Sequence, residues 1–357
     1  MTGAASLDAA VSRHQRVCLS RRGPEGLTRP RGPVTIVPIM AAPSETAPAG
    51  LEPGYRRLMR SGELAARVRE AERRLERCDL CARYCRVNRL ETIEGAVCRT
   101  GARALVHAAF PHQGEERCLS GWSGSGTIFF SWCNLRCAYC QNWEISWDGE
   151  GREVGSEELA GLMLGLQDAG CHNVNLVSPS HVVAQALAAV EIAARRGLAL
   201  PLVWNTGGYD SQEALRLLDG VVDVYMPDLK YGDSAVGRRL SRVPDYVEVN
   251  RAAVKEMHRQ VGDLDLDGRG LARRGLLVRH LVLPARLAGT EAVMRFLAEE
   301  VSPRTWVNLM DQYRPCYRAG EIPEMARWPT AVELQEALAA ARRAGIERLD
   351  PGSVGGG

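Results

Sequence analysis

The chain has 357 residues, of which 45% are hydrophobic and 25% are charged, so it is long enough for one large core or a core with a small appended module. Its formal net charge of +2 argues against a broad nucleic-acid footprint. The uncharged stretch from Val34 to Pro43, interrupted by Pro38, is too short to span a membrane.

The first 53 residues have a composition unlike the remainder. Six arginines and a single acid, Glu25, lie between Val11 and Gly32, and the stretch from Ala41 to Pro53 is rich in Ala, Pro, Ser and Thr. Such a stretch cannot pack a core, so residues 1–53 are expected to be disordered or to be an extension upstream of the natural start. The Gly-rich end, residues 351–357, is expected to form a disordered tail.

A helix is predicted from Tyr55 to Arg77, where Leu64, Val68 and Leu75 share one face and Gly62 is the weak point. It leads into a segment that contains four closely spaced cysteines. Residues 54–120 are therefore predicted to form a helix plus a small cysteine-rich metal-binding module.

Strand and helix patterns alternate over residues 121–350, which are predicted to form the main domain. The strand candidates are Thr127–Trp132, Asn173–Ser178, Leu202–Asn205, Val222–Asp228, Leu276–Leu283 and Thr305–Asp311. The helix candidates between them are Glu157–Ala169, His181–Arg195, Gln212–Leu218, Tyr246–Val261 and Glu291–Glu300. This alternation is typical of a parallel sheet, and six units are fewer than the eight of a closed barrel. We predict an α/β fold, a partial (β/α)6 TIM-like barrel.

Polar residues follow the predicted strands, at the barrel edge that usually carries the chemistry. They include Ser178 after the second strand, Asn205 and Thr206 after the third, and Asp228 and Lys230 after the fourth. Alternation along a strand puts Asp228 and Lys230 on one face. The fifth strand carries Arg279 and His280, of which one should point into the barrel.

The most informative feature is the spacing C-x3-C-x2-C of Cys133, Cys137 and Cys140 after the first strand. Three thiolates can hold three irons of a [4Fe-4S] cube and leave the fourth iron open to a substrate or cofactor. A zinc site is the alternative, but the next cysteine is Cys171, and a closed tetrahedral site would need a nearer ligand. Eleven cysteines in clusters also indicate a reducing, cytoplasmic location.

A second group, Cys78, Cys81, Cys85 and Cys98, supplies four thiolates. Four are enough to close either a zinc site or an auxiliary [4Fe-4S] cluster, and the spacing does not choose between them. Such a centre would serve either as an electron relay or as a structural staple.

The chain resembles the radical SAM (S-adenosylmethionine) superfamily and, more narrowly, the PflX-like homologues of pyruvate formate-lyase activating enzyme. The resemblance rests on the cysteine triad and on stretches such as Pro-Asp-Leu-Lys-Tyr at 227–231, Arg-His-Leu-Val-Leu-Pro at 279–284 and Met-Asp-Gln-Tyr-Arg-Pro at 310–315. It implies that Cys133, Cys137 and Cys140 bind a [4Fe-4S] cluster that SAM completes, with Tyr139 near the adenine.

The resemblance also suggests further site residues. The SAM-binding set that it implies is Tyr139, Asn175, Ser178, Asn205, Thr206, Asp228, Arg279 and His280, with Asp228 and Lys230 as catalytic candidates. The chain lacks the usual Gly-Gly-Glu after the second strand, and Asn205 replaces a family aspartate. Each candidate also has a plain structural interpretation: Asp228 and Lys230 as a strand-end ion pair, and His280 as a core histidine.

The function implied is reductive cleavage of SAM to a 5'-deoxyadenosyl radical that activates a glycyl radical enzyme. A flavodoxin or ferredoxin-type protein would donate the electron, and no nucleic acid or membrane would be involved. Two alternatives stay open: radical modification of a small molecule or peptide, and a non-catalytic iron–sulfur or zinc protein.

Overall fold

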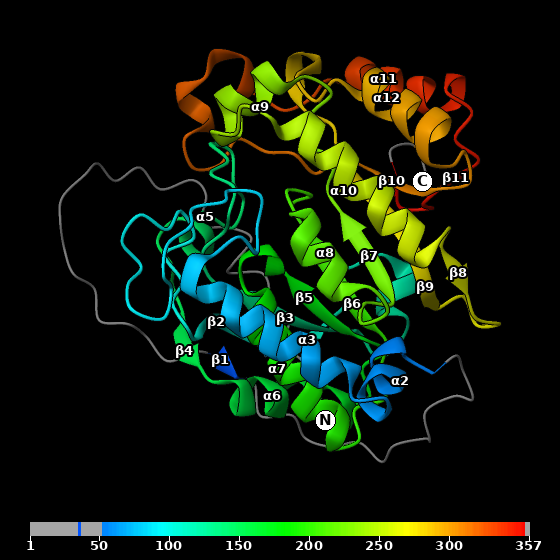
Figure 1. Ribbon diagram of the computed structural model, residues 1–357. Helices are drawn as coiled ribbons and strands as arrows, with labels where there is room; N and C mark the ends of the chain where they lie inside the picture. The colour runs from blue at the N-terminus through cyan, green and yellow to red at the C-terminus, as the bar shows by residue number, and fades with distance from the viewer. Residues whose placement is uncertain (1–34, 37–51, 354–357) are drawn as a thin grey trace, which may run out of the picture.

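The computed structural model describes residues 35–36 and 52–353, and in them an eleven-stranded, mostly parallel sheet forms the centre of the protein (Figure 1). Along the sheet the strands are β1 (Thr35–Ile36), β2 (Ala104–His112), β3 (Ser125–Phe130), β5 (Val174–Val177), β6 (Leu202–Thr206), β7 (Val224–Pro227), β9 (Ala272–Leu281), β10 (Trp306–Met310) and β11 (Arg348–Leu349). Two more strands pair at the sides, β4 (Arg152–Val154) with β2 and β8 (Asp265–Leu266) with β9. Every strand predicted from the sequence is present, and the predicted α/β fold is confirmed.

Helices pack around this sheet. They are α2 (Gly54–Arg60), α3 (Glu63–Arg73), α4 (Arg117–Ser120), α5 (Trp143–Ser146), α6 (Ser156–Asp168), α7 (Val183–Arg195), α8 (Gln212–Leu218), α9 (Ser234–Ser241), α10 (Tyr246–Val261), α11 (Thr290–Phe296) and α12 (Ala331–Arg343). Of these, α4 contributes Cys118 and Leu119 to the inner side of the sheet. The single helix predicted from Tyr55 to Arg77 was wrong: α2 ends before Gly62, whose φ of 77° interrupts the helix before α3. No helix in the described ranges has both the length and the apolar character that crossing a bilayer requires.

Apolar side chains alternate between the two faces of the parallel strands. On β9, Leu276 and Val278 pack in the large core between sheet and helices, whereas Leu277 packs in a small cluster on the other side. That small cluster includes Val203 of β6 and Met226 of β7, so it fills the inside of the curved sheet. The curvature brings the carboxyl ends of β3, β5, β6 and β7 toward one another, as a partial barrel requires.

The cysteine-rich module predicted over residues 54–120 is continuous with the main domain. Strand β2 pairs antiparallel with β3, so the predicted boundary at residue 120 cuts through a strand pair. The predicted extension, 1–53, lies outside the described residues except for 35–36 and 52–53. At the other end, the Ser353 hydroxyl accepts a hydrogen bond from the Leu309 N–H at 3.0 Å, so residues 351–353 are held against β10, and 354–357 lie outside the described residues.

Candidate active site

The cysteine triad lies on a loop that leaves β3 and is held in place by two backbone hydrogen bonds. The N–H of Ala138 donates to the carbonyl of Leu240 at 2.7 Å, and the N–H of Arg136 donates to that of Ser241 at 3.2 Å. Both acceptors are at the end of α9. A loop held in this way presents its three sulfurs from a fixed backbone, which is what a catalytic metal site requires.

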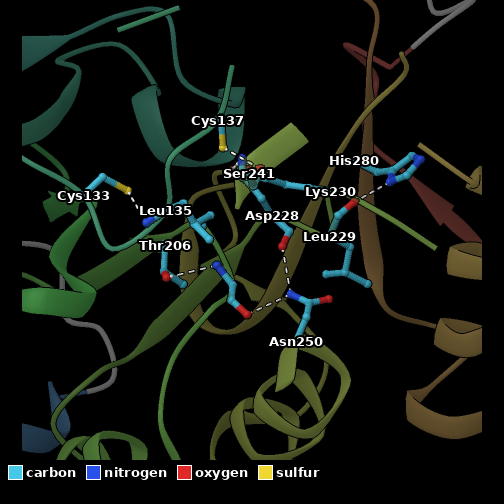
Figure 2. A network of polar contacts seen from close by, with 12 residues as sticks. Cys133, Leu135, Cys137, Thr206, Asp228, Leu229, Lys230, Ser241, Asn250 and His280 are labelled. Atoms are coloured by element: carbon cyan, nitrogen blue, oxygen red, sulfur yellow. Dashed lines mark hydrogen bonds and ion pairs between the residues drawn. The ribbon is translucent and has the colours of Figure 1, made fainter. Parts of the chain in front are cut away.

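Hydrogen-bonding groups are directed at all three sulfurs, Ser146 and the backbone of Asn142 being those at Cys140. The Ser241 hydroxyl lies 3.0 Å from Cys137 Sγ, and the Leu135 N–H donates to Cys133 Sγ at 3.4 Å (Figure 2). Burial and the neighbouring Cys137 raise the pKa of the Cys133 thiol to about 11, and the same two causes raise that of Cys140 to about 12. The thiols are therefore protonated at neutral pH unless a metal replaces their protons.

Lys230 and Asp228 form an ion pair, with Nζ and Oδ2 2.5 Å apart and side chains 19% and 24% exposed. The pair confirms that the two residues share a face of the strand end. Burial opposes the charge of Lys230, but Asp228 and Cys137 outweigh it and raise the pKa of Lys230 well above its usual value. Lys230 is thus a permanently charged ammonium group that acts on the cysteine loop (Figure 2).

Helix α10 supplies two side chains that hold the turns after β6 and β7 together. The Asn250 amide donates to the carbonyls of Gly208 and Asp228, both at 3.0 Å (Figure 2). The Tyr246 hydroxyl lies 2.9 Å from both the Gly207 and the Asp228 carbonyl oxygens. Asn250 and Tyr246 could not be predicted from the sequence, because nothing in a regular helical pattern marks residues that join two distant turns.

Tyr139, which was predicted to lie near the adenine, is buried within a group of tyrosines. The Tyr231 hydroxyl donates to that of Tyr139 at 2.8 Å and lies 2.6 Å from the Ser241 hydroxyl. Because Ser241 also contacts Cys137, a chain of hydroxyl groups joins the aromatic residue before the third cysteine to the second cysteine. Tyr231 belongs to the Pro-Asp-Leu-Lys-Tyr stretch and could have been selected from it, whereas Ser241 had no signal in the sequence.

The residues at the ends of β5 and β6 meet at the same edge of the sheet. Thr206 is buried and its hydroxyl is engaged by Asp210, Gly208 and Ser180, so it shapes the turn after β6. Ser178 has a left-handed φ of 58°, and its N–H donates to the carbonyl of Asn205 at 2.8 Å. Asn205 follows Trp204, which packs against the helices, so alternation directs Asn205 to the inside of the barrel.

Asn175 occupies a lower layer of the barrel than the other candidates. In the sheet register, Asn175 of β5 pairs with Val203 of β6, which pairs with Val224 of β7. Asp228, at the carboxyl end of the sheet, is four residues or about 13 Å further along the strand direction. Its side chain is fully buried, and neither amide atom has a hydrogen-bond partner among the described residues. Asn175 is thus a buried polar group on the floor of the barrel, below the cysteine loop.

Arg279 and His280 face opposite ways, as alternation predicted. The Arg279 guanidinium points into the barrel and pairs with Glu115 and with Glu116, the latter at 2.6 Å. His280 bonds the Leu229 carbonyl at 2.6 Å and Thr290 at 2.9 Å, and burial lowers its pKa to about 4. With both ring nitrogens engaged, His280 is a core histidine, so the structure does not support the prediction that it binds the cofactor.

The second cysteine group lies beside the first. Arg83, from between Cys81 and Cys85, donates from Nε to the carbonyl of Asn134 at 2.7 Å, next to Cys133. As it stands, no set of three Cys, His, Asp or Glu side chains in the described ranges is arranged around a position for a single metal ion. A [4Fe-4S] cube does not require that arrangement, because each thiolate binds a different iron.

A cleft of about 620 Å³ separates the cysteine-rich module from the triad loop and is lined by the arginines Arg83, Arg99, Arg136 and Arg242. The Arg136 guanidinium lies 5.2 Å from the ring centre of Trp147, and that of Arg242 lies 5.4 Å from the same ring. Among the residues that the structure describes, Glu94 is the one acid that lines the cleft. The cleft is therefore strongly positive.

The side chains around the triad fit a thiolate-ligated cluster together with a cofactor that carries a carboxylate. Three clustered thiols, N–H and hydroxyl groups aimed at sulfur, and the charged Lys230 all stabilise negative charge. Ser241 and Lys230 come from different elements, so the fold itself assembles the set.

Comparisons with known proteins agree with this site. A model of the radical SAM superfamily matches residues 127–263, from β3 to the end of α10. The uncharacterized protein MJ0674 of Methanocaldococcus jannaschii is 32% identical over 294 residues, which cover 80% of each chain. 

Solved structures with partial likeness include Streptococcus suis SuiB bound to its precursor peptide SuiA, with a TM-score of 0.40 and 12% identity over 59% of this chain and 43% of that one. They also include TYW1 with a lysine-pyruvate adduct, with a TM-score of 0.37 and 10% identity over 62% and 74% of the chains. Methylornithine synthase (PylB) gives a TM-score of 0.35 and 17% identity over 62% and 70%. On its motif, its matched domain and its relative, the chain belongs to the radical SAM superfamily, whose enzymes use a [4Fe-4S] cluster and S-adenosylmethionine.

Proposed function

We propose that the chain cleaves SAM reductively at a [4Fe-4S] cluster held by Cys133, Cys137 and Cys140, and that it directs the resulting radical at a partner protein. The observation that carries this proposal is the meeting of the triad loop with the Lys230–Asp228 pair at one edge of the sheet. When bound, the reduced cluster supplies the electron that splits SAM into methionine and a 5'-deoxyadenosyl radical.

The protein groups have separate tasks in this proposal. The ammonium group of Lys230, held by Asp228, binds the carboxylate of SAM by a charge-assisted hydrogen bond. Tyr139 provides an aromatic surface beside the third cysteine. Tyr246 and Asn250 fix the backbone beneath Lys230 before the cofactor arrives, which lowers the cost of organising the site.

The partner that we propose is a glycyl radical enzyme, in which the radical abstracts a hydrogen atom from a backbone glycine. The support is the resemblance of the Pro-Asp-Leu-Lys-Tyr and Met-Asp-Gln-Tyr-Arg-Pro stretches to the PflX-like homologues. Fold-level likeness does not extend to a substrate, so the partner needs its own experiment.

We further propose that an acidic electron donor of the flavodoxin or ferredoxin type docks over the arginine-lined cleft. Arg99 and Arg242 are exposed at this cleft, and the described chain pairs neither with a carboxylate side chain. Unpaired positive charge beside the triad loop would attract a negatively charged partner to the place where the electron is needed.

The first test is electron paramagnetic resonance of the reconstituted, reduced protein with and without SAM, under anaerobic conditions. We expect part of the cluster signal to change when SAM is added, and no SAM-dependent change in Cys137→Ala. The Cys171→Ala variant, which removes a buried cysteine outside the triad, should behave as the parent does. If no part of the parent's cluster signal responds to SAM, the radical function is overturned and an electron-carrying protein is left.

The second test addresses the partner. Reduced protein and SAM are incubated with pyruvate formate-lyase, and the glycyl radical is sought by electron paramagnetic resonance while 5'-deoxyadenosine is measured by chromatography. Both products are expected. 5'-Deoxyadenosine without a glycyl radical would retain the radical chemistry and contradict this choice of partner.

A further inference from the structure

The segment from residue 78 to residue 103 has no helix or strand and little apolar material to hold it together. Three of its large apolar side chains are exposed, Tyr84 by 40%, Leu90 by 50% and Ile93 by 49%, while Leu80 packs into the main core. Small segments that bury little apolar surface are usually held by disulfides or by a metal. None of the cysteines in the described ranges is in a disulfide.

The buried side of this segment instead carries thiols. Cys78, Cys81 and Cys98 are buried, and Cys85 is half-buried. The N–H of Cys78 donates to the carbonyl of Val87 at 3.0 Å, and the N–H of Arg86 donates to the carbonyl of Cys78 at 3.0 Å. These two bonds fold the chain back, so that Cys85 lies beside Cys78 across the turn.

Backbone strain is concentrated next to two of these cysteines. Tyr84 and Arg86, on either side of Cys85, have φ values of 46° and 57°, and Arg99, which follows Cys98, has a φ of 47°. Residues other than glycine enter this left-handed region at a cost, and they persist where the surrounding structure imposes it, commonly at ligand sites.

Arg89 gives the strongest indication. It is 3% exposed, and its guanidinium donates to the carbonyls of Thr100 at 2.6 Å and His181 at 2.8 Å and contacts Cys78 Sγ at 3.5 Å. No carboxylate among the described residues pairs with it, and arginine cannot lose its proton in a protein. A buried cation needs a counter-charge, and the sulfurs can supply one only as thiolates. Buried thiols become thiolates when a metal binds them.

We propose that Cys78, Cys81, Cys85 and Cys98 bind a second, thiolate-ligated metal centre with net negative charge, for which Arg89 is the counter-ion. Zinc and a [4Fe-4S] cluster share this chemistry, and the experiment below distinguishes them. Because no three of these thiols already surround a single-ion position, binding rotates them toward a common centre.

The same contacts connect this centre with the triad. Arg89 donates to the carbonyl of His181, and His181 Nε2 lies 3.0 Å from the carbonyl of Ser131, two residues before Cys133. Arg136 of the triad loop donates in turn to the carbonyl of Val97, beside Cys98. The second centre therefore braces the loop that holds the first.

The test is metal analysis of the full chain in which the triad is replaced by Cys133→Ala, Cys137→Ala and Cys140→Ala. After anaerobic purification or reconstitution, we expect about one zinc per chain or about four irons with matching sulfide. X-ray absorption at the edge of the retained metal should give four sulfur neighbours at about 2.3 Å. Adding Cys81→Ala and Cys98→Ala should remove that metal, whereas adding Cys118→Ala and Cys171→Ala, buried cysteines outside both groups, should not.

The proposal would be overturned if the triad variant bound no more zinc or iron than the variant that also carries Cys81→Ala and Cys98→Ala. So would retained metal with nitrogen or oxygen neighbours. Because the triad variant keeps all four cysteines of the second group, a folding defect in the Cys81→Ala variant does not affect this result. The metal content of the triad variant does not depend on SAM cleavage, which is tested separately in the parent protein.

Discussion

Ser241 is a single side chain through which the protein can set the redox behaviour of the triad. Its hydroxyl lies 3.0 Å from Cys137 Sγ. Hydrogen bonds to the sulfurs of an iron–sulfur cluster stabilise the more negative, reduced state and so raise its potential.

We predict that Ser241→Ala lowers the potential of the cluster. Loss of one hydrogen bond worth about 1 kcal/mol corresponds to a shift of about 40 mV for one electron. Ser234→Ala, on the same helix but bonded to Glu248 at the surface, is the control and should leave the potential unchanged. Redox titration followed by electron paramagnetic resonance measures both, and equal potentials in the two variants would show that Ser241 does not act on the cluster.

Lys230 combines a structural contact with a charge aimed at the cofactor. In Lys230→Met the carboxylate of Asp228 loses its partner in a largely buried place, so we expect the free energy of unfolding to fall by about 2 kcal/mol. Formation of 5'-deoxyadenosine should fall at least tenfold, a change equivalent to about 1.4 kcal/mol. Arg286→Met breaks an exposed ion pair with Glu336 and should leave the free energy of unfolding nearly unchanged. Full activity in Lys230→Met would remove Lys230 from the proposed site.

Individual site residues were predictable where chemistry is tied to local spacing. The triad, Asp228 and Lys230 could be selected because their separations along the chain are short and regular. Ser241 could not, because its contact with Cys137 spans 104 positions and arises only when α9 packs on the triad loop. For Arg279 and His280 the sequence left open which one faces the barrel, because it does not tell which of two neighbouring strand residues faces the helices.

At the scale of elements, the turns after β6 and β7 approach so closely that one of them requires glycine. A Cβ on Gly208 would lie 2.2 Å from Asn250 Nδ2 and 2.3 Å from the Asp228 carbonyl oxygen, and φ there is 74°. Gly170 has a similar φ of 81° but open space around it.

We predict that Gly170→Ala costs only the left-handed penalty of about 1–2 kcal/mol. Gly208→Ala should cost more, by about 2 kcal/mol or above, because the two turns must also separate. Urea unfolding measures both changes, and SAM-dependent spectral changes should weaken in Gly208→Ala alone. Equal costs for the two variants would mean that the close approach contributes nothing to stability.

The start of α2 is fixed to the sheet by a buried carboxylate whose charge depends on pH. Asp223 accepts from the N–H groups of Gly54 at 3.1 Å and Leu202 at 2.9 Å, and burial raises its pKa to about 6. Since that value exceeds the ordinary 3.8, the folded state binds more protons between the two values. The contribution of Asp223 to the free energy of unfolding is therefore fully present below about pH 4 and is lost as the pH rises through 6.

We predict that the Asp223→Asn variant lacks this loss. Between about pH 4 and pH 6.5 the free energy of unfolding of the parent should fall relative to that of the variant, by up to about 3 kcal/mol in all, and the difference should then stay constant at higher pH. Anaerobic urea titrations at three pH values measure the difference. A difference that stays constant from about pH 4 to pH 6.5 would contradict the raised pKa.

The helices and strands themselves were largely predictable, because burial on the helix-covered face imposes strict periodicity. The break at Gly62 was missed because the apolar spacing continues across it. Leu58, Leu64 and Val68 are all buried, although the first belongs to α2 and the other two to α3. Helix α12 was missed despite a capping box between Thr330 and Glu333, whose backbone N–H donates to the Thr330 hydroxyl at 3.2 Å. That motif is readable in sequence and would have located the start of the helix.

At the scale of the whole molecule, net charge is a poor guide to local charge. The sum of +2 conceals a cleft with four arginines and one acid next to the triad loop. Arginines distant in sequence meet there because the cysteine-rich module packs on the end of α9, where Arg83 donates to the carbonyl of Arg242 at 2.9 Å. A net charge summed over the whole chain therefore could not predict this concentration of positive charge.

If that cleft receives an acidic electron donor, the association rate should depend on ionic strength, because salt screens charges at about 10 Å in 0.1 M solution. We predict that reduction of the cluster by a flavodoxin slows several-fold as salt rises from 0.02 to 0.3 M, and slows about tenfold in Arg99→Gln with Arg242→Gln at low salt. Reduction by dithionite, which needs no docking surface, should be unaffected in that variant. Arg343→Gln, on the distant helix α12, is the matched control for loss of an exposed arginine. If the double variant accepts electrons from flavodoxin at the parental rate, the donor docks elsewhere, and the charge of the cleft must serve a different anionic partner.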